Sequence, residues 1–143
     1  MAHVCFDHVS KSYPGGHNAL TDISFEIAQG EIAFLTGHSG AGKSTLLKLI
    51  MLMEKASQGQ VLMDGINLAR LSQRQIPYHR RRIGVVFQNH QLLFDRSVFE
   101  NVALPLRISG YTSRDLERRV RAALDKVGLL TKEKQNPIEL SGG

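Results

Sequence analysis

The sequence has 143 residues, of which 42% are hydrophobic and 22% are charged, enough for one globular domain of modest size. This composition excludes a disordered or fibrous chain, and a single cysteine excludes an internal disulfide framework. No apolar run approaches the roughly 18 residues of a membrane-spanning helix. The net charge of +5 is compatible with nucleic acid, an anionic membrane surface or a polyphosphate ligand as the partner.

The first thirty or so residues predict two strands. Residues 4–9 mix apolar and polar side chains, and a Pro-Gly-Gly turn follows at 14–16. Residues 20–27 alternate apolar and polar side chains, which is typical of a half-buried strand. Because only a short turn separates the two strands, they favour antiparallel pairing.

A glycine-rich loop follows, with the sequence Gly-His-Ser-Gly-Ala-Gly-Lys-Ser at 37–44, and it matches the phosphate-binding pattern G-x-x-x-x-G-K-[ST] at every fixed position. The apolar run Ile32–Thr36 before it predicts a buried parallel strand, and Leu46–Met53 after it predicts a buried helix. Glycines let the backbone curl so that several N–H groups face one anion, and the helix start adds its own unpaired N–H groups. The residues assigned to nucleotide binding in this loop are Gly37, His38, Ser39, Gly40, Ala41, Gly42, Lys43, Ser44 and Thr45.

Two of these side chains have distinct predicted roles. Lys43 would place its charge on the β- and γ-phosphates, and the Ser44 hydroxyl would ligate Mg²⁺. The alternative interpretation is a glycine-rich strand-to-helix turn with a surface lysine.

The next stretch predicts a hairpin and a second core strand. Residues 60–63 form a short strand, Asp64-Gly65 a tight turn, and residues 71–78 a short helix or turn. Ile83–Phe87 predicts the second buried strand, with Gln88 at its carboxyl end, the edge where open α/β sheets place their ligands.

Two capping-box patterns predict the helices of the remaining chain. Ser97–Glu100 opens the first helix, which we expect Pro105 to bend or end. Thr112–Asp115 opens an amphipathic helix that stops near Gly128.

The order of four features resembles the ATP-binding subunit of ABC transporters: an aromatic at Tyr13, the phosphate loop, a glutamine at 88, and a terminal Leu-Ser-Gly-Gly. Residues 34–50, 81–88 and 122–130 are most similar to the cell-division members of that family. The resemblance implies an α/β P-loop NTPase of the ABC ATPase type, with an N-terminal antiparallel β subdomain, a partial parallel core and a helical subdomain.

The resemblance implies one ABC ATP-binding domain over residues 1–143, incomplete at its C-terminus. Residues 1–88 would form the β subdomain and phosphate-loop core, and residues 89–143 the helical subdomain up to the signature motif. Family members continue with an Asp, a Glu and a His that act in hydrolysis, so we expect the chain as given not to hydrolyse ATP.

The resemblance also assigns roles to single residues. Tyr13 would stack on adenine; the alternative is a strand-end tyrosine before a turn. Gln88 would join Ser44 on Mg²⁺ and, with Lys43, serve catalysis; the alternative is a surface glutamine. The signature motif, which would bind the γ-phosphate held by the opposite subunit of a homodimer, consists of Leu140, Ser141, Gly142 and Gly143.

The implied function is an ATP-binding subunit, with ATP and Mg²⁺ as cofactors, on the cytoplasmic face of the cell inner membrane. It would couple ATP binding and hydrolysis to an integral membrane, permease-like partner in cell division, and residues 89–96 correspond to the region that meets that partner. Leu92, Leu93 and Phe94 would form an apolar contact surface there; the alternative is that they pack the helical subdomain onto the core. Lipoprotein release, efflux and uptake are the alternatives. A nucleic-acid-binding module is less favoured because no such motif is present, and a GTPase would need an Asn-Lys-x-Asp stretch. The arginines at 80–82 are interpreted as a solvated face, with a lipid-headgroup contact as the alternative.

Overall fold

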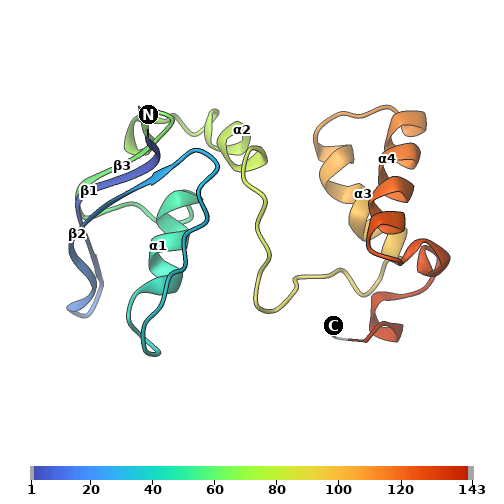
Figure 1. The fold of residues 1–143 in the computed structure, drawn as a ribbon, viewed down its shortest axis with the longest axis horizontal. Helices are drawn as coiled ribbons and strands as arrows, with labels where there is room; N and C mark the ends of the chain where they lie inside the picture. Colours follow the sequence, from blue (N-terminus) through green and yellow to red (C-terminus); the bar gives the residue numbers. More distant parts are fainter. Residues whose placement is uncertain (1, 142–143) are drawn as a thin grey trace. The chain divides into compact units, whose positions relative to one another are not determined.

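The computed structural model describes residues 2–141, which divide into a first compact unit up to Gly84 and a second from Val85 onward. The first unit contains the sheet of the protein, and the second is helical (Figure 1). Each unit has its own hydrophobic core.

The sheet has four strands in the order β2-β1-β3-β4, all paired antiparallel. They are β1 (Ala2–Tyr13), β2 (His17–Ala28), β3 (Gln58–Met63) and β4 (Ile66–Asn67). The predicted antiparallel pairing of the first two strands is confirmed, and both strands are longer than their apolar patterns alone indicate.

A two-residue turn joins β3 to β4. Asp64 and Gly65 have φ angles of +50° and +75°, and Met63 pairs with Ile66 across the turn. Two positive φ angles at the turn match the right-handed twist of a hairpin, which is why an Asp-Gly pair serves well here. The predicted tight turn is confirmed.

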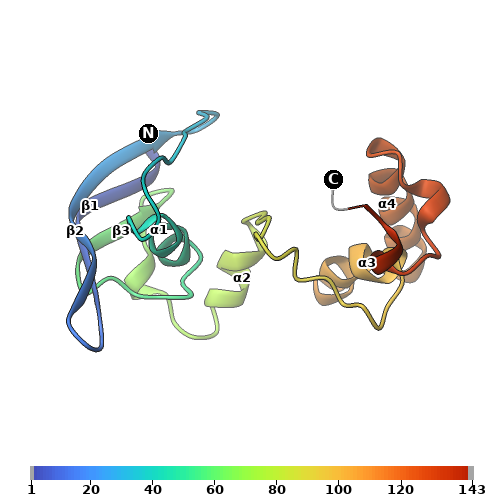
Figure 2. The same ribbon diagram turned by 90° about the horizontal axis from the view of Figure 1, so that it is seen from below.

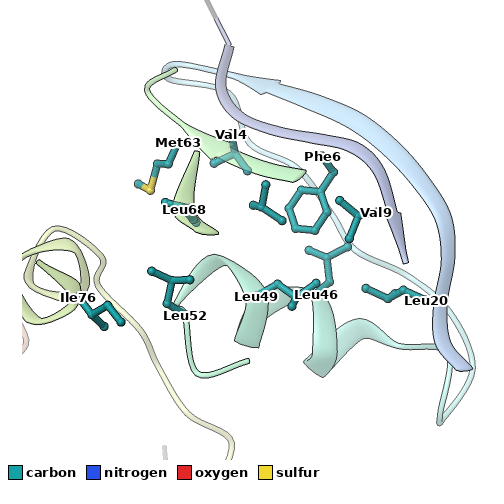
Figure 3. Packing of buried hydrophobic residues seen from close by; sticks show 11 residues of the cluster. Val4, Phe6, Val9, Leu20, Leu46, Leu49, Leu52, Met63, Leu68 and Ile76 are labelled. Atoms are coloured by element: carbon teal, nitrogen blue, oxygen red, sulfur yellow. The ribbon is translucent and has the colours of Figure 1, made fainter. Parts of the chain in front are cut away.

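Helix α1 (Lys43–Ile50) lies against one face of the sheet in both views of the ribbon (Figures 1 and 2). Figure 3 shows Phe6 and Val9 of β1 directed toward Leu46 and Leu49 of the helix. The Phe6 ring also stacks on Phe25, with 4.6 Å between the ring centroids. Burying an aliphatic or aromatic side chain of this size contributes about 1.5–3 kcal/mol each, so this layer holds α1 in place.

The buried residues of the first unit come from the sheet, from α1 and from the segment after β4. They are Val4, Phe6, Val9, Leu20, Leu46, Leu49, Leu52, Val61, Met63, Leu68 and Ile76.

Two strand predictions are wrong. Ile32–Thr36 and Ile83–Phe87 form no strand, and neither pairs with another strand within residues 2–141. A β-strand exists only where a neighbour satisfies its N–H and C=O groups, so an apolar run without such a partner stays outside a sheet. Ile32 and Val86 are accordingly 81% and 95% exposed.

The second unit is built on two helices that lie side by side, α3 (Val98–Ile108) and α4 (Ser113–Lys126) (Figure 1). Both predicted N-terminal caps form. Helix α3 runs past Pro105, because Leu106 beyond it still packs on the helical core. The buried residues of that core are Val98, Ala103, Leu116, Val120 and Leu124.

Three short 3₁₀ helices and one short α-helix complete the described chain. They are η1 (Leu68–Arg70), α2 (Ile76–Arg81), η2 (Leu130–Lys132) and η3 (Pro137–Glu139). Among residues 2–141, no helix has the length and hydropathy of a bilayer-spanning segment.

Candidate nucleotide-binding site

The phosphate loop ends at the N-terminus of α1. Gly42 is the N-cap residue, with φ +88°, and no side chain caps the helix. The amides of Lys43, Ser44 and Thr45 therefore have no intrahelical partner, since the first residues of an α-helix donate to nothing within it. Together with the positive end of the helix dipole, these amides favour an anion at this point.

Gly42 is also the point where the loop lies closest to the sheet. A Cβ added there would lie 2.4 Å from the Ala19 carbonyl oxygen and 2.7 Å from a Leu20 methyl group. No side chain can occupy that space, so this position requires glycine for its contact with β2 as well as for its backbone angle. The start of α1 is fixed against β2 by this contact.

The Lys43 side chain folds back over the loop. Its Nζ donates to the carbonyl oxygens of Gly37 and His38, at 2.7 and 2.6 Å. The Ala41 amide also donates to the His38 carbonyl, at 3.2 Å. The ammonium is thus held at the loop itself, where a phosphate bound by the helix amides would meet it.

The two hydroxyl residues after Lys43 face different surroundings. Ser44 is exposed, whereas Thr45 is buried against the core with 9% exposure. Only Ser44 therefore offers its hydroxyl to solvent, and its role as a ligand of Mg²⁺ stays a prediction.

Tyr13, at the end of β1, lies beside α1. Its hydroxyl is 3.4 Å from the Thr45 hydroxyl, and the Lys11 ammonium lies 4.9 Å from its ring centroid. The structure thus brings the predicted adenine-stacking residue to the phosphate helix from a position 32 residues earlier.

The charged residues in the sequence around the loop are all positive. From Ile32 to Met53 the chain has no Asp or Glu, while it has Lys43 and Lys48. Uncapped helix amides, an exposed hydroxyl and an ammonium without a local carboxylate are the donor set that the phosphates of a nucleotide require. The residues of the loop fit such a ligand.

The other predicted site residues belong to the second unit. Gln88 lies in an exposed turn, Leu140 is half-buried against the helical core, and Ser141 is exposed. Gly142 and Gly143 lie outside the described residues.

Residues of α2 support the site in a way the sequence did not indicate. His79, 7% exposed, donates from Nε2 to the Ile50 carbonyl at 2.7 Å. Arg80 donates from Nε to Met51 O at 3.0 Å and from Nη2 to Leu52 O at 2.8 Å. These bonds satisfy carbonyls left unpaired at the C-terminus of α1, the helix whose other end forms the phosphate site. Arg80 sits in a run of three arginines that alone predicts only a solvated face, so no sequence signal identified this contact.

A family model described as ABC transporter matches residues 20–143, and the chain belongs to this family. Within it, the chain is similar to the cell division ATP-binding protein FtsE of Escherichia coli (strain K12). The two are 57% identical over 138 residues, which cover 96% of this chain and 62% of that protein. FtsE of Haemophilus influenzae is 51% identical over 139 residues, covering 96% of this chain and 64% of that protein. The predicted resemblance to the cell-division members is confirmed.

Other relatives carry different names. The methionine import ATP-binding protein MetN of Rhizobium meliloti is 46% identical over 145 residues, covering 98% of this chain and 40% of that protein. The dimeric structure of MJ0796, a bacterial ABC transporter cassette, matches with a TM-score of 0.87 and 31% identity, over 97% of this chain and 63% of that one. CbiO1 from Clostridium perfringens matches with a TM-score of 0.86 and 28% identity, over 98% of this chain and 56% of that one. These matches confirm the predicted fold class. The chain spans about three fifths of the length of the FtsE proteins and covers 62% of the Escherichia coli one.

Proposed function

We propose that this chain is the nucleotide-binding portion of an FtsE-like ATP-binding subunit, with ATP and Mg²⁺ as its cofactors. Lys43 would contact the β- and γ-phosphates, Ser44 would ligate Mg²⁺, and Tyr13 would stack on adenine. The observation that carries the proposal is the uncapped start of α1, with the Lys43 ammonium held over the same loop.

Two further groups would complete the site in the whole subunit. Gln88 would give its amide oxygen to Mg²⁺ and position the attacking water, so that in-line hydrolysis rests on placement and charge stabilisation. The signature motif at 140–143 would bind the γ-phosphate held by a second copy in a homodimer. The similar MJ0796 cassette is described as dimeric, in one case in a post-hydrolysis state bound to ADP and Pi, which supports this arrangement.

An integral membrane partner of the FtsX type would dock on the second unit. By binding that partner, the subunit would be held peripherally on the cytoplasmic face of the inner membrane. Within residues 89–96, Leu92, Leu93 and Phe94 are 39%, 37% and 59% exposed. Leu92 also borders an open apolar hollow of about 370 Å³ beside α3 and α4. Exposed apolar surface of this kind marks an interaction site.

The output of that coupling would be cell division, since the identity to FtsE, 57%, exceeds that to MetN, 46%. An import subunit is the second candidate, favoured by the MetN and CbiO1 similarities. Neither candidate involves nucleic acid.

The proposal is tested by titrating the 143-residue chain with a fluorescent ATP analogue in the presence of Mg²⁺. Lys43→Ala is expected to weaken binding about 10- to 100-fold, the worth of a charge-assisted hydrogen bond. Lys48→Ala, on an exposed position of the same helix, removes the same charge and is expected to bind like the wild type. Binding that survives Lys43→Ala, or that falls equally in Lys48→Ala, would contradict a phosphate site in the loop.

A further inference from the structure

Lys11 of β1 is a largely buried lysine outside the phosphate loop. Its side chain is 12% exposed, and its ammonium pairs with the Glu54 carboxylate at 2.8 Å and donates to the Lys55 carbonyl at 2.9 Å. The same ammonium lies 4.9 Å from the Tyr13 ring centroid, within the range of a cation–π interaction. A lysine is rarely removed from water unless its charge is paired, and these three contacts supply the pairing.

The carboxylate that holds the Lys11 ammonium is itself fixed in place. Glu54 belongs to the segment between α1 and β3, residues 51–57, and its amide donates to the Lys48 carbonyl of α1 at 3.3 Å. Farther along this segment, the Ser57 amide donates to the Ser10 carbonyl of β1 at 2.8 Å. The segment is therefore attached to both α1 and β1, and the ammonium of Lys11 has a defined position.

The Tyr13 hydroxyl has a weaker hold on its surroundings. Its contact with the Thr45 hydroxyl is 3.4 Å long, whereas hydrogen bonds between two hydroxyl groups ordinarily measure about 2.5–3.0 Å. The cation–π interaction with Lys11 acts on the aromatic ring itself and does not depend on the hydroxyl. The orientation of the Tyr13 ring therefore depends more on Lys11 than on Thr45.

We propose that Lys11 is a positioning residue for the nucleobase, which it affects by holding the ring of Tyr13. This inference rests on the stacking role of Tyr13 in the proposed function. A ring that is already held in one orientation loses less conformational freedom when a base stacks on it, so the base binds more tightly. The phosphates bind the loop and not the ring, so Lys11 should affect a ligand that has a base and not a bare polyphosphate.

The test compares the affinity of the 143-residue chain for ATP with its affinity for inorganic tripolyphosphate, each with Mg²⁺, by titration calorimetry. Lys11→Met keeps an apolar side chain of similar length and removes the ammonium. It should lower the ratio of the two affinities about three- to fivefold, through weaker ATP binding. Glu54→Gln removes the anchor of the ammonium without changing the buried lysine, and it should lower the ratio by a smaller factor. Changes in net charge act on both ligands, so the ratio reports the base.

A matched control is available one residue beyond Glu54. Lys55→Met removes the same charge as Lys11→Met, but the Lys55 side chain is exposed and its carbonyl, which accepts from Lys11, remains. This variant should keep the wild-type ratio.

A double-mutant cycle tests whether Lys11 acts through Tyr13. Tyr13→Ala alone should lower the ratio about 10-fold, because it removes the stacking ring. In that background Lys11→Met should lower the ratio no further, since there is no ring left to hold.

Three results would overturn the inference: a wild-type ratio in both Lys11→Met and Glu54→Gln, an equal fall in Lys55→Met, or a full additional fall when Lys11→Met is added to Tyr13→Ala. The first would leave Lys11 with a structural role only, attaching β1 to residues 51–57. Failure of the proposed function gives different results. Both ligands would then bind independently of Lys43, or Tyr13→Ala would leave the ratio unchanged.

Discussion

Gly42 combines a left-handed backbone with a position too close to β2 for any side chain. Its φ is +88°, and an added Cβ would lie 2.4 Å from the Ala19 carbonyl oxygen. Gly40 has a similar φ of +82° but nothing within 4 Å of an added Cβ. We expect Gly40→Ala to cost about 1 kcal/mol of unfolding free energy, from backbone strain alone. Gly42→Ala should cost about 2 kcal/mol more, because the backbone of β2 or α1 must move.

Urea unfolding of the two variants measures this difference directly. The comparison holds the residue change and the backbone angle constant, so the excess in Gly42→Ala reports the contact with β2. Equal losses would show that β2 does not fix the start of α1.

Individual residues of the site could be predicted from the sequence where a pattern of consecutive residues identifies them. The spacing from Gly37 to Ser44 encodes a turn that leads into a helix, so the identity of the loop could be predicted from eight consecutive residues. The contact of Tyr13 with Thr45 depends on strand register and helix packing across the unit, which no local pattern specifies. The Tyr13 role came from the family resemblance for that reason.

The helices could likewise be predicted from local patterns, whereas the strands depend on residues elsewhere in the chain. The Ser97 hydroxyl accepts from the Glu100 amide at 3.2 Å, and the Thr112 hydroxyl accepts from the Asp115 amide at 3.4 Å, as the two capping boxes predicted. The apolar run Ile32–Thr36 predicted a strand equally strongly, but a strand also needs a partner from elsewhere in the chain. Apolar composition reports a tendency toward burial, and it does not report whether the neighbouring strand is present.

The bond from α2 to the C-terminus of α1 should stabilise the phosphate helix as an element. His79→Leu keeps the apolar volume but leaves the Ile50 carbonyl without its donor, which should cost about 1–3 kcal/mol of unfolding free energy. Tyr78→Leu, on the exposed side of the same helix, should cost less than about 0.5 kcal/mol. Hydrogen exchange should accelerate at the α1 amides in His79→Leu alone. Unchanged exchange there would mean that the sheet, and not α2, holds the helix.

For the whole molecule, acidification should reduce stability through two ion pairs, one in each unit. The hydrogen bond from His3, followed by that from Arg82, holds the pKa of Asp64 below its ordinary value, and the hydrogen bond from Arg121 does the same for Glu133. A lowered folded pKa contributes stability that is present above the ordinary values of about 3.9 and 4.3 and is lost as pH falls through the folded values. Unfolding measured from pH 6 to pH 2.5 should show this loss.

Variants of the second pair test this assignment. Glu133→Gln should flatten the acid dependence, and Arg121→Gln should flatten it to a similar extent because both remove the same interaction. Added salt should reduce the effect, since the Arg121 side chain is half-exposed to solvent. An acid limb as steep in both variants as in the wild type would exclude this pair as its source.

The opposite pH dependence is expected near neutrality, from His8 on β1. Its hydrogen bond to Asp22, with Nδ1 2.7 Å from Oδ1, and the charge of that carboxylate raise the pKa of His8. A raised folded pKa contributes stability that is fully present below the ordinary value of about 6.5 and is lost as pH rises through the folded value. His8→Asn and Asp22→Asn test this, because both positions have positive φ, +49° and +50°, which asparagine tolerates. Either variant should lower the unfolding free energy at pH 5.5 more than at pH 8.5. The double variant should show the same pH dependence of the unfolding free energy as either single variant. A difference from the wild type that stays constant across this range would show that the pair is held by geometry and not by charge.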